Sequence, residues 1–214
     1  MTEIIPAINV DTFDEVVRRI KMTEGHAVPM VHIDVADGSF TPKAVWHAAE
    51  DLKKISLPLA VEIHFMVREP EKKIGPWLTA PISRIIFHVE AAEDPRALMS
   101  RIRGADKKAG VAICPETPCE TLVPFIDKAD LLLLLAVSPG PSHQEFDRTI
   151  LKKISFLREK APQSIIEVDG GIKIGIAKEC ACAGASALAV ASALFDAREP
   201  FDQSLNILRE DAET

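Results

Sequence analysis

Eight short apolar runs recur at fairly even spacing along the whole chain, and helical patterns lie between them. Several runs are unbroken and rich in leucine or β-branched residues, which is typical of parallel strands buried on both faces. The runs that we predict to be strands are Ile4–Asn9, Met30–Val35, Leu59–Phe65, Arg84–Val89, Gly110–Cys114, Leu131–Val137, Ile165–Asp169 and Ala187–Val190. This alternation, without a linker, predicts an α/β protein with one (β/α)8 TIM barrel domain over residues 1–214.

Helix start signals support the alternation. Asp11 and Thr12 precede an amphipathic stretch as a cap, and Asp94 followed by Pro95 begins another. The second and third connections are less regular. The alternative is a doubly wound open sheet, which usually has fewer strands. Here the first strand is not followed by the Gly-x-Gly-x-x-Gly motif of dinucleotide-binding sheets.

Composition excludes several classes of function. The chain has 214 residues, of which 47% are hydrophobic and 27% charged, a balance typical of soluble proteins. No apolar run approaches the roughly 18 residues of a membrane helix, and the first residues lack the basic region of a signal peptide. The net charge of −7 argues against nucleic-acid binding. We therefore expect a cytoplasmic protein with a small-molecule ligand, and an anionic ligand is possible if backbone N–H groups line its pocket.

The four cysteines give no clear functional signal. They are Cys114, Cys119, Cys180 and Cys182. Without a secretory signal a disulfide framework is not expected, and a Cys-x-Cys spacing is wrong for a zinc ribbon. We interpret these residues as small buried hydrophobic groups.

Polar side chains gather where the predicted strands end, which is where (β/α)8 barrels carry their chemistry. His32 and Asp34 alternate with apolar residues in the run VHIDV, so they share the face that points into the barrel. Glu62 and His64 repeat this spacing in the next run, and Asp169 ends the seventh. If the barrel closes, these side chains converge on one mouth.

Two imidazoles and two carboxylates form a competent ligand set for a divalent metal. The predicted ligands are His32, Asp34, His64 and Asp169. We expect zinc, with iron, manganese and cobalt as alternatives, because the ligand types alone do not choose. His88 and Glu90, from the fourth run, could equally support these ligands or bind directly.

Asp34 and Asp169 also suggest acid–base catalysis. Placed on opposite faces of a flat intermediate, one carboxylate can remove a proton while the other delivers one. The metal would hold the carbonyl oxygen and stabilise the charge of an enediolate as a Lewis acid. This combination predicts inversion of a carbon next to a carbonyl group, without an organic cofactor.

The same segments, in order, resemble those of the ribulose-phosphate 3-epimerase family over nearly the whole chain. They are IIPAIN, HIDVADGSFTP, VEIHFMV, FHVEA, GVAICPETP, AVSPGPSHQEF, EVDGGI and GASALAVASALF. The resemblance implies a barrel of the ribulose-phosphate-binding type that interconverts ribulose 5-phosphate and xylulose 5-phosphate in the pentose phosphate pathway. It implies the same four metal ligands, and Asp34 and Asp169 as the acid–base pair.

The resemblance also implies a homo-oligomer with contacts near the barrel mouth. Phe40, Val45 and Trp46 are apolar positions just past the second strand, where such a contact could form. Trp46 could equally pack within its own domain.

The substrate site departs from the family pattern at several positions. By resemblance, the substrate-binding residues are Met66, Gly140, Ser142, His143, Gly170, Gly171, Ala191 and Ser192. Ser142 and His143 stand where the family has paired glycines, and Ala191 stands where it has another glycine. Elsewhere Ala7 replaces a serine, Ala36 and Leu135 replace two methionines, and Glu62 replaces an aspartate. The changes at Ser142, His143 and Ala191 all affect the phosphate-binding part of the site, whereas the acid–base pair is intact.

Three functions remain open from the sequence. The first is a metal-dependent epimerase of a ketose phosphate. The second is an epimerase or isomerase of another sugar, with a modified phosphate or none, motivated by the altered loop after the sixth strand. The third is a non-catalytic barrel that binds a metal or metabolite. The Asp-x-Lys-x-x-Asp pattern of decarboxylases on similar barrels is absent from the third run, which argues against that class.

Overall fold

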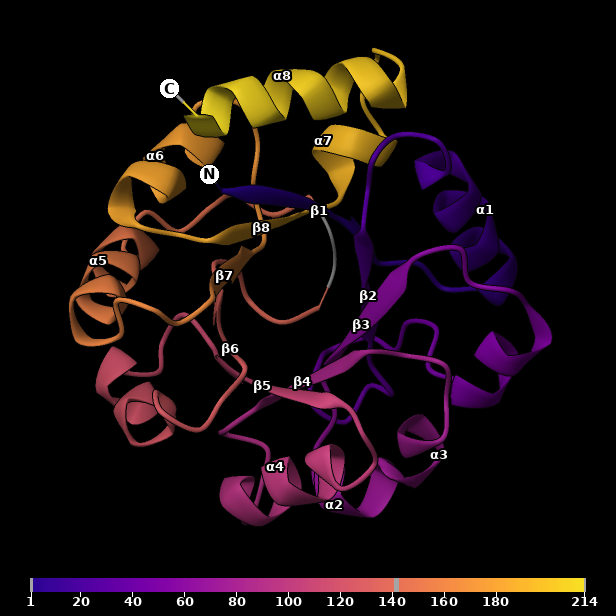
Figure 1. Ribbon diagram of the computed structural model, residues 1–214, viewed down its shortest axis with the longest axis vertical. Coiled ribbons are helices and arrows are strands. Elements are labelled where there is room, and N and C mark those ends of the chain that lie inside the picture. The colour runs from indigo at the N-terminus through magenta and orange to yellow at the C-terminus, as the bar shows by residue number, and fades with distance from the viewer. Residues whose placement is uncertain (1, 141–142, 214) are drawn as a thin grey trace.

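The eight predicted strands form one closed parallel barrel in chain order, with helices outside it (Figure 1). The structure is a computed structural model that describes residues 2–140 and 143–213. The strands are β1 (Glu3–Ile8), β2 (Met30–Val35), β3 (Ala60–Phe65), β4 (Arg84–His88), β5 (Lys108–Ile113), β6 (Leu131–Leu135), β7 (Ile166–Asp169) and β8 (Ala187–Val190). The predicted (β/α)8 barrel is confirmed, and the open-sheet alternative is wrong because β8 pairs with β1.

The connections differ in how much helix they contain. The helices are α1 (Phe13–Thr23), α2 (Pro70–Lys73), α3 (Gly75–Leu78), α4 (Pro95–Arg103), α5 (Ile150–Lys160), α6 (Ile176–Ala183), α7 (Ser192–Phe195) and α8 (Phe201–Glu213). Two 3₁₀ helices, η1 (Ala49–Lys54) and η2 (Cys119–Phe125), follow β2 and β5. The side chains of Thr12 and Asp94 cap α1 and α4 as predicted. The second and third connections are irregular, also as predicted.

Alternation along β2 sorts its side chains between two environments. Val31, Ile33 and Val35 pack outward in the hydrophobic layer between the barrel and the helices. His32 and Asp34 therefore point into the barrel. The parallel register of β2 and β3 places His32 beside Glu62 and Asp34 beside His64, at matching heights.

The interior of the barrel is divided between an apolar side and a charged side. On the side formed by β4, β5 and β6, a separate apolar cluster fills the space, with Ile86, Ala112, Leu131, Leu133 and Leu135. The opposite side holds buried ionisable groups from β2, β3, β4 and β7. The buried ionisable groups are His32, Asp34, Glu62, His64, Arg84, His88, Glu167 and Asp169.

The apolar residues past β2 do not form an exposed surface. Trp46 is 5% exposed and stacks on Phe13, with the ring of Trp77 against its edge. Val45 is buried, and Phe40 packs partly buried beside it. Of the two interpretations left open for Trp46, packing within its own domain is the one that the structure confirms.

The cysteines follow the sequence interpretation only in part. Cys119 and Cys180 are buried, whereas Cys114 is half-buried and Cys182 is exposed; all four are free thiols. Cys180 and Cys182 lie two residues apart on α6 and so face in different directions. The expectation of four buried groups is wrong for Cys182.

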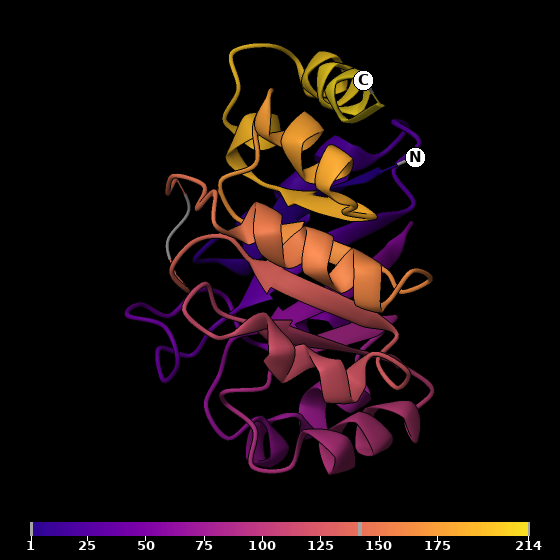
Figure 2. The same cartoon turned by 90° about the vertical axis from the view of Figure 1, so that its left-hand side faces the viewer.

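The barrel mouth lies at the C-terminal ends of the strands. In Figure 2 the segments that follow β2 and β6 project from this end, on the left of the view. The end of α8 lies near the start of β1 in both views (Figures 1 and 2). Within the described part of the chain, no helix has the length and apolar character needed to cross a membrane.

Candidate active site

The four predicted metal ligands meet at the mouth of the barrel. His64 Nδ1 lies 3.0 Å from Asp34 Oδ1 and 3.3 Å from Asp169 Oδ2. His32 Nε2 lies 3.4 Å from Asp34 Oδ1 and 3.9 Å from Asp169 Oδ2. The two imidazole nitrogens and two carboxylate oxygens thus surround one point, although β7 is separated from β2 in the sheet by β8 and β1.

This donor set fits a divalent metal. Ligands about 2.0–2.1 Å from a tetrahedral zinc ion stand roughly 3.3–3.4 Å from one another, close to most of the four separations. His32 Nε2 is also buried without a hydrogen-bond partner. The other ring nitrogen, Nδ1, faces carboxylates and so carries the hydrogen of a neutral imidazole. The lone pair of Nε2 is then directed at the site. A metal ion would satisfy that nitrogen.

Asn9 holds Asp34 from the other side. Its side-chain amide donates to Asp34 Oδ2 at 2.8 Å and to the carbonyl of Gly140 at 3.2 Å. Asp34 can therefore offer Oδ1 to a cation while Oδ2 stays fixed at the pocket wall. The sequence interpretation missed Asn9 as a site residue. The signal was present, because Asn9 lies two residues after Ala7, which β1 places beside His32.

A charged cluster beneath the site supports His32. His32 Nδ1 lies 3.1 Å from Glu62 Oε1 and 3.0 Å from Glu167 Oε1. The Arg84 guanidinium donates to Glu62 Oε2 at 2.6 Å and lies 3.8 Å from Glu167 Oε2. We call Glu62, Arg84 and Glu167 the floor cluster. Arg84 and Glu167 were not predicted, although each lies an even number of residues before an inward-facing group.

His64 is supported by a different set of groups. Its Nε2 lies 2.9 Å from His88 Nε2, and His88 Nδ1 lies 3.4 Å from Glu90 Oε2 and 3.5 Å from the Cys114 thiol. Glu90 Oε1 accepts from the Cys114 backbone N–H at 2.8 Å and from the Thr117 hydroxyl. Of the two roles left open for His88 and Glu90, this geometry favours support of a ligand.

Burial and hydrogen bonds shift the pKa values of the site in opposite directions. Burial alone would lower the pKa of both ligand histidines. Hydrogen bonds to Asp169 and Asp34 nevertheless raise the pKa of His64 to about 9. The neighbouring carboxylates of Asp34, Glu167 and Glu62 raise the pKa of His32 well above its usual value. Without a metal, both imidazoles are therefore in the positively charged form at neutral pH.

The pKa values of the buried carboxyl groups are shifted as well. Burial would raise the pKa of Asp34, but the neighbouring imidazoles of His32 and His64 hold it well below its usual value. Burial and the neighbouring charge of Glu62 raise the pKa of Glu167 to about 7. The two floor cluster carboxylates therefore do not both ionise fully at neutral pH.

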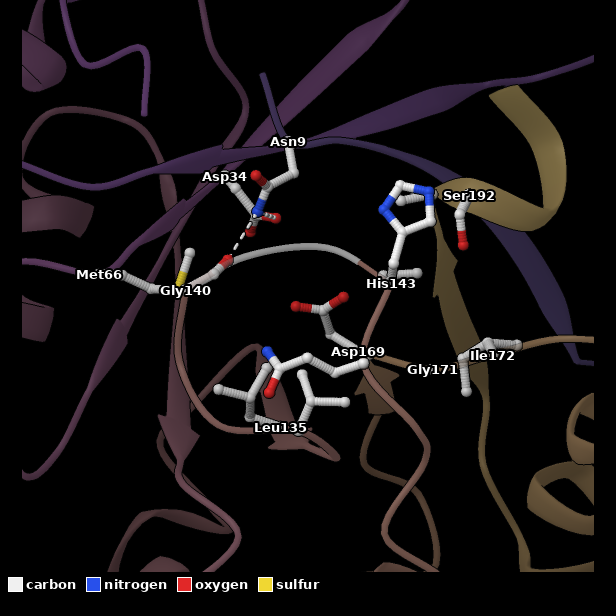
Figure 3. A pocket seen from close by; sticks show the side chains of 15 residues that line it. Asn9, Asp34, Met66, Leu135, Gly140, His143, Asp169, Gly171, Ile172 and Ser192 are labelled. Atoms are coloured by element: carbon white, nitrogen blue, oxygen red, sulfur yellow. Dashed lines mark hydrogen bonds between the residues drawn. The ribbon is translucent and has the colours of Figure 1, made fainter. Parts of the chain in front are cut away.

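A pocket lined by Asp34 and Asp169 encloses about 540 Å³, part of it open to solvent. Asp34 and Asp169 face it from opposite walls (Figure 3). The predicted substrate residues that line it are Met66, Gly140, His143, Gly170, Gly171, Ala191 and Ser192. Ser142, also predicted, lies outside the described residues. Leu135, one of the methionine replacements, lines the same pocket.

Gly171 allows the loop after β6 to close one wall of the pocket. A Cβ at this position would lie 2.6 Å from the backbone nitrogen of Phe146, which is too close for any side chain. Its φ of +69° also favours glycine. The loop therefore packs directly against the turn that follows Asp169.

His143 stands at the rim of the pocket. Its ring lies beside Ser192 in Figure 3, and its Nε2 is 3.3 Å from Asp196 Oδ2. Among the described lining residues there is no lysine or arginine. An anion at this rim would meet the His143 ring and backbone N–H groups.

Comparison with known proteins identifies the family. The model of the ribulose-phosphate 3-epimerase family matches residues 3–195. The chain belongs to the ribulose-phosphate 3-epimerase family. It is 31% identical to a ribulose-phosphate 3-epimerase of Schizosaccharomyces pombe, over 92% of this chain and 89% of that protein. It is 36% identical to one of Chlamydia muridarum, over 78% of this chain and 76% of that protein.

These matches confirm the resemblance seen in the sequence and, with it, the class of carbohydrate epimerases, which are isomerases. A solved structure of orotidine 5′-phosphate decarboxylase from Pyrococcus horikoshii OT3 superposes with a TM-score of 0.65 at 13% identity. It covers 99% of both chains. At this identity the likeness to the decarboxylase shows the shared fold alone.

Proposed function

We propose that this protein is a metal-dependent epimerase of a ketose phosphate, with ribulose 5-phosphate and xylulose 5-phosphate as the preferred pair. The observation that carries the proposal is the convergence of two imidazoles and two carboxylates under one pocket. His32, Asp34, His64 and Asp169 would hold the metal, for which zinc is our first choice. The family membership supports the same reaction.

Asp34 and Asp169 carry the proton transfer in this proposal. They come from β2 and β7 and face the pocket from opposite sides, so one removes the proton at C3 while the other reprotonates the other face. Asn9 keeps Asp34 oriented through Oδ2. A divalent ion bound by these residues would supply Lewis-acid stabilisation of the negative charge on the substrate oxygen. Met66 and Leu135 line the pocket with apolar surface, which excludes water.

The rim would bind the phosphate end of the substrate. Gly140, His143, Gly170, Gly171, Ala191 and Ser192 line that part of the pocket. Backbone N–H groups and the Ser192 hydroxyl can hold an anion without a lysine or arginine. Ser142 joins this group as a prediction from the sequence alone.

Interconversion of the two C3 epimers tests the roles of the two aspartates. Asp34→Asn and Asp169→Asn are each expected to lower interconversion by at least about a thousandfold, because inversion needs one carboxylate on each face of the substrate. The control is Asp37→Asn, since Asp37 pairs with Lys73 outside the pocket and should keep normal interconversion. Normal interconversion in either pocket variant would contradict the proposal.

The altered rim favours a second candidate, an epimerase or isomerase of another sugar with a modified phosphate or none. The exposed His143 ring and the absence of lysine or arginine among the described lining residues support it. Turnover on matched ketose phosphates and free ketoses separates the two. A preference for phosphate favours the first, and equal rates favour the second. No turnover on any of them, with the metal bound, would favour the non-catalytic alternative.

The homo-oligomer, the cytoplasmic location and the single domain over residues 1–214 stay predictions from the sequence. Light scattering of the purified protein measures the first directly.

A further inference from the structure

The contact between His64 and His88 restricts where their hydrogens can be. Both rings are fully buried, and their Nε2 atoms lie 2.9 Å apart. At this distance one nitrogen must donate a hydrogen and the other must accept it with a lone pair. Two N–H groups facing each other would clash, and two lone pairs would repel.

The metal side of His64 decides which nitrogen donates. His64 Nδ1 is the atom that faces Asp34 and Asp169, so it is the atom that would bind the metal. A metal-bound imidazole nitrogen carries no hydrogen, so the remaining hydrogen of His64 is on Nε2. His64 therefore donates, and His88 Nε2 must present a lone pair.

The hydrogen of His88 is then on Nδ1, where acceptors are available. Glu90 Oε2 lies 3.4 Å away and the Cys114 sulfur 3.5 Å away. Glu90 is itself held through Oε1 by the Cys114 backbone N–H and the Thr117 hydroxyl. The ring of Phe40 packs 4.8 Å from the His88 ring, which restricts rotation of the imidazole.

We propose that His88 is a positioning residue that fixes His64 in its metal-binding tautomer by accepting a hydrogen bond at Nε2, and that Glu90 orients His88. This inference rests on the proposed function, since it concerns the same metal. It also gives a role to Cys114, which no disulfide or ligand role explains, as a backbone donor and sulfur contact at the end of the chain of hydrogen bonds.

The same argument excludes a second cation at His88, Glu90 and Cys114. These three groups lie close enough to one another to bind one. A cation there would need the lone pair of His88 Nδ1, which would move the hydrogen of His88 to Nε2. That hydrogen would then point at the N–H of His64. The cluster therefore serves the neighbouring metal site instead of binding its own ion.

Zinc affinity, measured by competition with a chromophoric chelator, tests the role without measuring catalysis. His88→Phe keeps a ring of similar shape and removes the acceptor, and we expect zinc binding to weaken by about 10–100-fold. His88→Gln restores an acceptor oxygen and should recover part of the loss. The control is Ile86→Val, which alters the neighbouring inward position of β4 but removes no polar atom from His64 or His88.

Equal zinc affinities for His88→Phe and Ile86→Val would overturn the inference while leaving the proposed function standing. If the unaltered protein fails to bind zinc or the alternative metals, the proposed function fails, and this role of His88 fails with it. The two failures are therefore distinguishable.

Long-range ¹H–¹⁵N NMR of the zinc-loaded protein gives a second readout, because it reports the tautomer of each histidine. We expect the hydrogen on Nδ1 of His88 and on Nε2 of His64. A hydrogen on Nε2 of His88, or on both of its nitrogens, would overturn the inference. Loss of the Nε2–H signal of His64 in His88→Phe, through exchange with solvent, would support it.

Discussion

The two histidines of the candidate metal site are supported in different ways. His32 donates from Nδ1 to carboxylates whose charge is compensated by a buried arginine. His64 contacts a second imidazole, with a carboxylate only behind it. Carboxylate acceptors make a ligating imidazole more basic, whereas a neutral acceptor mainly orients it. Carboxylate acceptors therefore make the imidazole of His32 on β2 more basic. A neutral acceptor mainly orients the imidazole of His64 on β3.

The difference follows from where each support lies in the barrel. The floor cluster is buried, and its charged groups depend on one another because little solvent reaches them. The support of His64 lies nearer the rim, and the side chain of Glu90 is 24% exposed. We therefore expect loss of the Arg84 cation to act mainly on folding, and changes to single acceptors of the ligand histidines to act mainly on metal binding.

The largest expected effect is on folding stability. Arg84→Met should lower the free energy of unfolding by about 3–5 kcal/mol, because it leaves two buried carboxylates, Glu62 and Glu167, with only His32 as a cationic neighbour. Urea denaturation monitored by circular dichroism measures the change. The double variant Arg84→Met with Glu62→Met should recover much of the loss, since it removes both charges of the pair. A loss below about 1 kcal/mol in the single variant would contradict this view of the floor cluster.

A smaller effect is expected from pH in the metal-free protein. The pKa of His64 is raised to about 9 when folded, against an unfolded value near 6.5, so its protonated form favours the folded state. That contribution is fully present below pH 6.5 and is lost as pH rises through 9. We expect a decrease of about 2 kcal/mol in the unfolding free energy between pH 7 and 9.

Chelator-treated protein should be used for this measurement, with thermal or urea unfolding at each pH. Saturating zinc should reverse the trend, because the metal competes with these protons for the histidines. A metal-free protein that gains stability over this range would contradict the assignment of His64 as a charged group.

The smallest effect concerns Glu62 itself. Glu62→Gln should weaken zinc binding by about tenfold, because His32 loses one charged acceptor while Glu167 remains at 3.0 Å. Without the neighbouring charge, Glu167 ionises more readily and takes over part of the role. Calorimetric titration with zinc measures the change. No loss of affinity would mean that Glu167 alone supports His32.

The fold and the four candidate ligands were accessible from the sequence because both depend on short-range patterns. The eight apolar runs fix the strands, and a spacing of two places His32 with Asp34 on one inner face. Predicting Asp169 as a fourth ligand required one further argument, which is that the C-terminal ends of parallel barrel strands meet at one mouth. Closure of the barrel then places Asp169 on β7 close to Asp34 on β2, although no short-range sequence pattern links the two residues.

The supporting residues were harder to predict because their roles arise across the barrel interior. Arg84 is the first residue of β4, and a charged residue at a strand end is expected at the surface. In the closed barrel its side chain instead lies beside Glu62 of β3 and Glu167 of β7. Asn9 and Glu167 have the correct alternation, but alternation alone does not show what a side chain contacts. The packing of Trp46 could not be decided from the sequence because its ring partners, Phe13 and Trp77, come from other connections of the barrel.

Around the sheet, β1 and β8 lie between β2 and β7. Across the mouth, one cation bound by Asp34 and Asp169 would link β2 and β7 directly. A bound cation would act as a brace between opposite walls, so its loss should loosen the closure of the cylinder as well as stop turnover. The metal content of a preparation would then report how rigid its molecules are.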